Sequence, residues 1–230
     1  MIWALLLSCR SDPGWLIEPE APGDEACPPA PPIPVAPPRQ LPIQIRVGRG
    51  LDPDRAAWHT RWGAAWWRRR GVVWQIAPGW RRTPDTPPLA GSPGADIDAL
   101  LAPLAHAVQR PAEPWIELVF VSELATPTSP ASHWFSPLTG LAVSPALPHG
   151  DDPVAQALGA LADGATPTVF LALGAADRLP DERARFVLAH EVGHALGLVH
   201  HREAGNLMGP GFPRCAPELT PAQLSALQLP

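Results

Sequence analysis

"HEVGHALGLVHH", residues 190–201, contains four of the eight histidines in this 230-residue chain. His190 and His194 are four residues apart, so on a helix their imidazoles project from one face, one turn apart. Two imidazoles in that arrangement can bind one metal ion at about 2.0–2.1 Å each. The spacing therefore predicts a metal site on a helix that runs from about residue 180 to residue 196.

Two further residues in this stretch complete the predicted site. Glu191 lies about 100° around the helix from His190, so its carboxylate stays off the metal but can reach a water bound to it. Gly197 permits a left-handed backbone, which lets the helix end and brings His200 back to the same ion. Three protein ligands with one open position are typical of catalytic zinc, whereas structural zinc sites fill all four positions.

The stretch matches the pattern H-E-x-x-H-x-x-G-x-x-H, through which the chain resembles the metzincin metallopeptidases, most closely their matrixin-like members. A second motif, "GNLMGP" at 205–210, contains Met208, the only methionine after Met1, and the only asparagine, Asn206. The family carries a methionine in a tight turn beneath its metal, and the resemblance gives Met208 that place. The alternative is an ordinary loop with a buried methionine.

The resemblance covers residues 165–228 well. Before residue 115, only the order of the predicted strands and helices agrees with the family. The resemblance implies an α/β fold of the α+β zincin type. This fold has a twisted mixed sheet with an antiparallel edge strand, a long active-site helix and a C-terminal helix. "GLAVS" (140–144) resembles the edge strand that binds substrate in the family. The calcium and structural-zinc segments of animal matrixins are not evident, nor is an upstream cysteine switch.

The function that the resemblance implies is a zinc-dependent endopeptidase, a hydrolase of extended polypeptides with one catalytic Zn²⁺. Glu191 would act as the general base on a zinc-bound water. The alternative is a non-catalytic zinc-binding envelope lipoprotein that keeps the fold. Glu191 argues against this alternative, because a site kept only for metal does not need that carboxylate.

Alternation, capping residues and helix breakers predict the remaining elements. Strands are expected at 42–47, 72–77, 115–121, 140–144 and 168–173, and helices from Pro53, at 96–108, from Pro153 and after Thr220. Residues 126–138 are expected to form a loop. Trp58, Trp62 and Trp66 recur every fourth residue and are interpreted as the core face of their helix; the alternative is a helix on a membrane surface.

Composition limits the classes of partner. The net charge is −5, and all 17 basic residues are arginine, so there is no electrostatic case for nucleic acid. We expect a monomer whose partner is its polypeptide substrate. The chain contains no run of 18 or more apolar residues, so no membrane-spanning helix is predicted. The bias toward Ala, Pro, Gly and Arg is typical of a GC-rich, bacterial genome.

The N-terminal part divides into two segments before the predicted domain at 42–230. Residues 1–9, "MIWALLLSC", resemble the lipobox of bacterial lipoproteins, with Cys9 as the lipidated residue, although no basic residue precedes the run. Residues 10–41 are rich in proline and predict a stiff linker; the alternative is an ordered strap. This organisation predicts an exported protein, either attached to the envelope through Cys9 or secreted. The alternative is a cytoplasmic protein with an apolar N-terminus.

The chain has three cysteines. If Cys9 carries lipid, Cys27 and Cys215 remain as an even pair. Both are flanked by proline, in irregular segments that run over the surface, and a disulfide between them is expected in an exported protein. The alternative is two unpaired thiols in a cytoplasmic protein.

Overall fold

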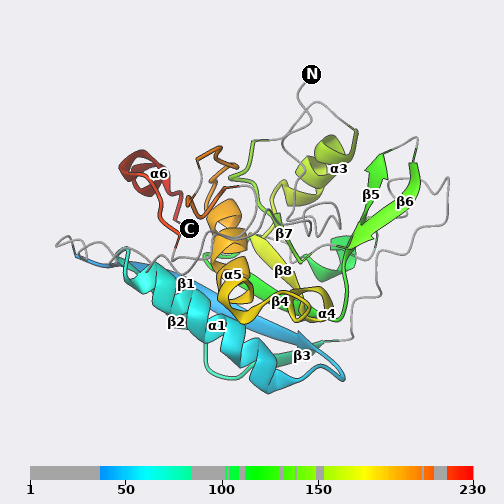
Figure 1. The fold of residues 1–230 in the computed structure, drawn as a ribbon, viewed down its shortest axis with the longest axis horizontal. Helices are drawn as coiled ribbons and strands as arrows, with labels where there is room; N and C mark the ends of the chain where they lie inside the picture. Colours follow the sequence, from blue (N-terminus) through cyan, green and yellow to red (C-terminus); the bar gives the residue numbers. More distant parts are fainter. Residues whose placement is uncertain are drawn as a thin grey trace, which may run out of the picture.

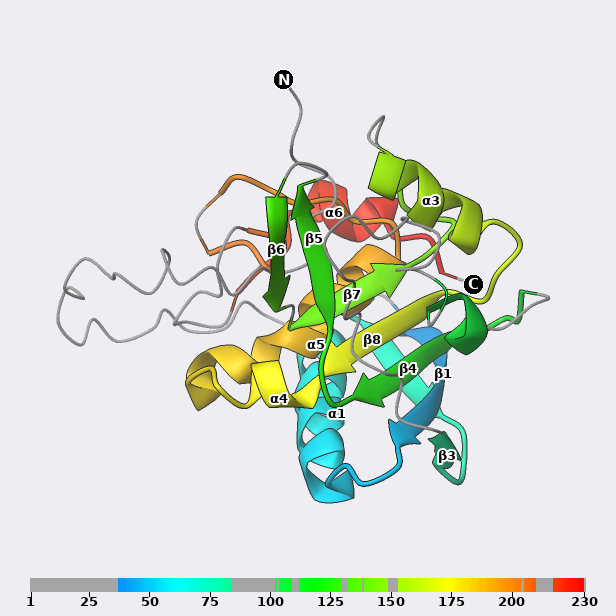
Figure 2. The same cartoon turned by 90° about the vertical axis from the view of Figure 1, so that its right-hand side faces the viewer.

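The computed structural model describes residues 37–83, 102, 104–108, 112–129, 132–137, 139–148, 153–203, 205–209 and 217–229. Within these residues the main sheet has six strands in the order β2-β1-β4-β8-β7, with β3 also paired to β1 (Figures 1 and 2). The strands are β1 (Arg39–Gly48), β2 (Val72–Ile76), β3 (Arg81–Thr83), β4 (Ile116–Val121), β7 (Gly140–Val143) and β8 (Thr168–Ala172). All pairs are parallel except β7 with β8, so the mixed sheet has the predicted antiparallel edge strand.

Two helices, α1 (Pro53–Arg68) and α5 (Asp181–Ala195), pack together on one face of this sheet (Figure 1). The face is apolar because alternate residues of β1 point the same way, and Leu41, Ile43 and Ile45 are buried in the same cluster as the two helices. The opposite face packs against α3 (Pro153–Ala162) and residues 104–108. The active-site helix predicted from the histidine spacing therefore lies in the middle of the molecule.

The ends of the helices follow the predicted signals. Asp52 caps α1 through a hydrogen bond from the Asp54 amide, with Pro53 in the first turn. The short helix α4 (Leu173–Ala176) connects β8 to the segment before α5. The closing helix α6 (Pro221–Ala226) begins with a capping box in which Thr220 and Gln223 bond reciprocally. None of the helices in the described ranges is both long and apolar enough to cross a membrane.

The two ends of the described chain meet at α6. The Arg39 guanidinium, at the start of β1, donates to the Leu224 carbonyl at 3.0 Å. On the other side, the Gln228 amide donates to the Leu196 carbonyl at 3.0 Å, directly after α5. The C-terminal segment at 221–228 therefore joins the first strand of the sheet to the end of α5.

The loop predicted for residues 126–138 is wrong. β5 (Ala125–Ser129) and β6 (Ser132–Pro137) form a separate two-stranded antiparallel sheet, with a register shift between Pro127 and Ser129. The segment lacks the clear apolar alternation of a half-buried strand, so its sequence resembles a loop although its backbone pairs locally. β1 also begins at Arg39, three residues before the predicted strand.

The tryptophan prediction for α1 is only partly correct. Trp66 is buried, but Trp62 is 40% exposed, and Arg185 of α5 lies over its ring at 5.3 Å. A spacing of four residues drifts by about 40° per repeat on a helix of 3.6 residues per turn, so three such positions cannot share one narrow face. The buried face is completed instead by Trp67 and His59.

Of the helix predicted at 96–108, only residues 102 and 104–108 are described, and residues 104–107 are helical. The predicted lipidation segment at 1–9 and most of the proline-rich linker lie outside the described residues.

Candidate metal centre

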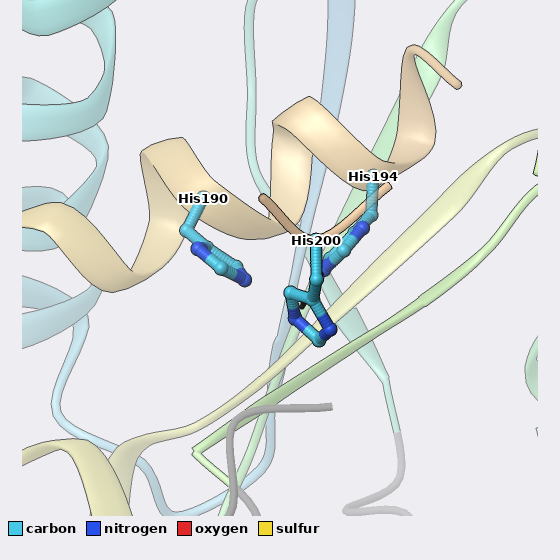
Figure 3. A group of neighbouring side chains, drawn as sticks. All are labelled: His190, His194 and His200. Atoms are coloured by element: carbon cyan, nitrogen blue, oxygen red, sulfur yellow. Dashed lines mark hydrogen bonds between the residues drawn. The ribbon is translucent and has the colours of Figure 1, made fainter. Parts of the chain in front are cut away.

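His190 and His194 of α5 and His200 of the loop after it form one group of side chains (Figure 3). One ring nitrogen from each lies within 4.8 Å of those of the other two. The Nε2 atoms of His194 and His200 are 3.2 Å apart. The ring centroids of His190 are 4.8 Å from His194 and 5.4 Å from His200. The structure therefore brings together all three ligands predicted from the sequence.

Main-chain carbonyls fix the two α5 imidazoles. Nδ1 of His190 lies 2.6 Å from the Leu207 carbonyl oxygen, and Nδ1 of His194 lies 2.7 Å from the Leu198 carbonyl oxygen. A carbonyl only accepts, so Nδ1 carries the proton in each ring and Nε2 keeps its lone pair for a metal. The carbonyls thus set both the tautomer and the direction of the lone pair.

Burial keeps these rings neutral, the state that binds a metal. His190 is 1% exposed, and burial, together with the positive charge on His200, lowers its pKa to about 3. Burial also lowers the pKa of His194 well below its usual value, as do the charges of the two neighbouring imidazoles. Imidazoles in the neutral form suit zinc and other borderline transition metals.

Gly197 makes the turn that brings His200 to the group. Its φ is 89°, in the left-handed region, and its amide donates to the His194 carbonyl at 2.9 Å. The Leu198 amide then donates to the Gly193 carbonyl at 2.9 Å, which completes a glycine C-terminal cap. A side chain at residue 197 would be strained by the backbone and crowded by the Ala146 carbonyl oxygen, 3.2 Å from its Cβ.

Met208 lies in a turn packed against α5. Its side chain is fully buried, and a Cβ on Gly193 would lie 2.7 Å from the Met208 sulfur, so the thioether occupies the space that this glycine leaves. The Met208 amide donates to Asn206 Oδ1 at 2.9 Å, and the Met208 carbonyl accepts from the His201 amide at 2.7 Å. The turn therefore fixes the backbone directly after His200.

The C-terminal segment holds this turn from behind. Leu207 donates its amide to the Glu218 carbonyl at 2.8 Å, and the Glu218 amide donates to the Gly205 carbonyl at 2.9 Å. Asn206 and Gln223 exchange amide hydrogen bonds of 2.8 and 3.3 Å. Sequence reasoning did not assign Gln223 a place near the site. Its only signal was the T-x-x-Q capping pattern, which reports on the helix and not on its neighbour.

Arg70 anchors the same segment to α1. Its guanidinium lies over the Trp66 ring at 3.5 Å, donates to the Pro217 carbonyl at 2.8 Å and pairs with the Glu218 carboxylate at 2.6 Å. Burial lowers the pKa of Arg70, while the Glu218 charge raises it. Arg70, the last of the three consecutive arginines at the end of α1, thus holds residues 217–218 in place behind the methionine turn. The sequence did not indicate this role.

Glu191 is fully buried, and its side chain lies against Gly140, the first residue of β7. The predicted base is therefore next to the antiparallel edge strand. His201, in contrast, turns away from the group: its Nδ1 accepts from the Glu203 amide at 3.2 Å, and its side chain is 40% exposed. Cys9, Cys27 and Cys215 lie outside the described residues, so the lipidation and the disulfide stay predictions.

No protein-family model matches the chain, and no curated protein matches it. Among solved structures, it is similar to metalloproteinase-II from Bacteroides fragilis, with a TM-score of 0.46 and 12% identity over 87% of this chain. The chain spans 57% of the length of that protein. It is also similar to archaemetzincin from Methanopyrus kandleri, with a TM-score of 0.46 and 16% identity over 82% of this chain and 94% of that one.

Proposed function

We propose that this protein is a zinc-dependent endopeptidase of the matrixin-like metzincin kind. The observation that supports this best is the group of three imidazoles that converge on one point, two of them buried, with Glu191 directly after the first. The donor set fits zinc, because His190 and His194 each direct Nδ1 to a carbonyl and so present Nε2 to the ion. A zinc ion at such a site supplies a Lewis acid that acidifies water and polarises a carbonyl group.

Glu191 is the general base in this proposal. Its carboxylate accepts a proton from the attacking water and afterwards donates it to the leaving amine of the cleaved peptide bond. The helix separates the two roles: His190 and His194 share one face, and Glu191 is rotated away from them toward Gly140. The same turn of α5 thus provides both ligands and base without competition for the metal.

The proposed substrate is an extended polypeptide that lies along β7. This strand is the last in the order of the main sheet, and within the described ranges no strand pairs with its outer edge. An extended peptide can add to such an edge through main-chain hydrogen bonds, which favours peptides over compact small molecules. β7 also contacts α5 directly, so a peptide on this edge would lie near the histidine group.

Chelator-sensitive cleavage of unfolded casein tests the proposal. We expect the wild-type protein to contain zinc and to cleave, and Glu191→Gln to keep the zinc but lose at least about 10²-fold in rate, the lower end of general-base contributions. His201→Gln is the matched control and should cleave normally, since His201 lies outside the histidine group. A zinc-loaded wild-type protein that cleaves no peptide would instead favour the zinc-binding lipoprotein without catalytic activity.

A further inference from the structure

Gly140, at the start of β7, lies closer to Glu191 than any other amino acid there would allow. A Cβ on Gly140 would lie 2.5 Å from Glu191 Cγ and 2.7 Å from both Cδ and Oε1, and these are its three nearest atoms. Carbon atoms in good van der Waals contact are about 3.5–4.0 Å apart. Gly140 is not among the described glycines with positive φ, so the backbone conformation does not require glycine. Glycine is required at residue 140 because the Glu191 side chain occupies the space that a Cβ would need.

The strand cannot easily move away from this contact. Gly140 pairs with Leu171 of β8, and the preceding Thr139 carbonyl accepts from the Ala172 amide at 3.0 Å. Just after β7, Ser144 Oγ donates to the Ala195 carbonyl of α5 at 2.8 Å. Both ends of β7 are therefore fixed, one to the sheet and one to the helix that carries Glu191.

Glu191 has little freedom of its own. Its side chain is fully buried, and its neighbour His190 is held by the Leu207 carbonyl. A methyl group at residue 140 would overlap with Cγ as well as with the carboxyl group, so the whole Glu191 side chain would have to change rotamer. The imidazole of His190 would not be displaced directly.

We propose that Gly140 is a positioning residue: its missing side chain fixes the Glu191 carboxylate against the edge strand. This inference rests on the proposed function, in which Glu191 is the base and β7 binds the peptide. The strand that would hold the scissile peptide thus also sets the place of the group that takes the proton. Displacement by about 1 Å can lower a catalysed rate about 10²-fold.

The first experiment is a double-mutant cycle that needs no activity. The unfolding equilibrium of the metal-free protein is measured for wild type, Gly140→Ala, Glu191→Ala and the double variant. We expect Gly140→Ala to shift this equilibrium toward the unfolded state by about tenfold in the presence of Glu191, and by less than about threefold when Glu191→Ala has removed the overlapping atoms. Equal losses in both backgrounds overturn the proposal. So does a double variant that fails to fold, because the requirement for glycine would then come from other neighbours.

The second experiment measures the consequence for catalysis and for metal. Gly140→Ala should bind zinc within about threefold of the wild-type affinity in a chelator competition, while kcat falls about 10²-fold and KM changes by less than about threefold. A normal kcat, or a loss confined to KM, overturns the positioning role. If the wild-type protein cleaves nothing, the proposed function fails and the stability cycle alone decides where the carboxylate is held.

Gly63→Ala is the matched control for both experiments. A Cβ on this α1 glycine would lie 2.8 Å from the Trp74 ring and 3.5 Å, an ordinary van der Waals distance, from Leu188 of α5, so the substitution overpacks the core to a similar degree while Glu191 is not among its three nearest contacts. It should destabilise the fold equally in the Glu191 and Glu191→Ala backgrounds and leave kcat unchanged. A kcat loss as large as that of Gly140→Ala would show that general strain, and not the contact with Glu191, accounts for the effect.

Discussion

Each buried imidazole of the metal centre depends on one hydrogen bond to a main-chain carbonyl, and each carbonyl comes from a segment after α5. Leu198 follows His194 in the turn made by Gly197, and Leu207 belongs to the methionine turn. The direction of the lone pairs is therefore set by backbone, which substitutions of neighbouring side chains change little. The ligands themselves are then the residues whose replacement should have the largest effect on metal binding.

His194→Ala should abolish stoichiometric zinc binding, because two of three imidazoles are not enough to hold the ion tightly in a site of this kind. We expect the affinity to fall more than about 100-fold in a competition with a chromogenic chelator. His201→Ala, which removes a side chain outside the group, should bind zinc as the wild type does. Full zinc occupancy in His194→Ala would show that the ion is bound elsewhere.

The grouping of the three histidines could be predicted from the sequence because a four-residue spacing on a helix and a glycine before the third histidine encode their geometry locally. The partners that orient them could not. Leu207 acts through its carbonyl, which any residue possesses, and Gly140 acts through the absence of a side chain. The residue type at position 207 or 140 therefore does not indicate either role. Both roles depend on segments that come together only in the folded chain.

Helix α6 is connected to the histidine group through a chain of hydrogen bonds and not by direct contact. Gln223 completes the capping box of α6 and also bonds Asn206, whose side chain holds the Met208 amide. The preceding carbonyl in that turn, from Leu207, accepts from His190. The side-chain amide of Gln223 thus both caps α6 and supports the turn whose Leu207 carbonyl orients His190.

Gln223→Ala should reduce the unfolding free energy by about 1 kcal/mol, as the loss of a capping interaction does, and weaken zinc binding by up to about tenfold. Gln223→Glu keeps the oxygen that accepts from Thr220 and Asn206 but loses the donor to Asn206 Oδ1, so we expect an intermediate effect on zinc. Denaturant titration and chelator competition measure the two quantities. Unchanged zinc affinity in Gln223→Ala would separate α6 from the site.

Met208→Leu should leave the site loaded and active. The sulfur acts here by filling the space above Gly193, and a swap that conserves volume usually costs less than about 1.5 kcal/mol. Thermal unfolding and the casein assay measure the outcome. A stable, zinc-loaded and wholly inactive Met208→Leu variant would mean that the sulfur has an electronic role that packing does not explain.

Sequence patterns predicted five of the six strands of the main sheet, all except β3, and the caps of α1 and α6, since alternation and capping are local. They failed where pairing or exposure is decided by partners. The hairpin of β5 and β6 has too little apolar alternation to be recognised as strands. Trp62 was assigned to the core on its spacing, whereas the drift of about 40° per four residues leaves it at the surface beneath Arg185.

At the scale of the whole molecule, the packing around α1 buries the side chain of His59 and so makes stability depend on pH. The His59 ring is fully buried, and Asp177 Oδ1 lies 3.7 Å from its Nε2. Burial, and then the charge of Arg55, lowers the pKa of His59 to about 4, although Asp177 acts in the opposite direction. The native state thus holds this imidazole neutral at pH values where the unfolded chain protonates it.

Stability should therefore decrease as the pH falls from about 6.5 toward 4, since the unfolded state binds the extra proton in this window. The difference between the two pKa values corresponds to about 3 kcal/mol at most. His59→Gln, which stays neutral, should give a shallower decrease. Denaturant titrations at pH 7.5, 6, 5 and 4 provide the comparison, and an unchanged slope in His59→Gln would contradict the assignment.

The placement of α6 between β1 and the methionine turn also has a consequence for biosynthesis. His190 is oriented by Leu207, and Leu207 is held by Glu218 and, through Asn206, by Gln223, all of which leave the ribosome after the three histidines. The first strand likewise gains its bond to Leu224 only after residue 224 has been translated. A nascent chain therefore carries its histidines and Glu191 before it can arrange them, and the peptidase activity proposed above would arise only after residues 218–224 have left the ribosome.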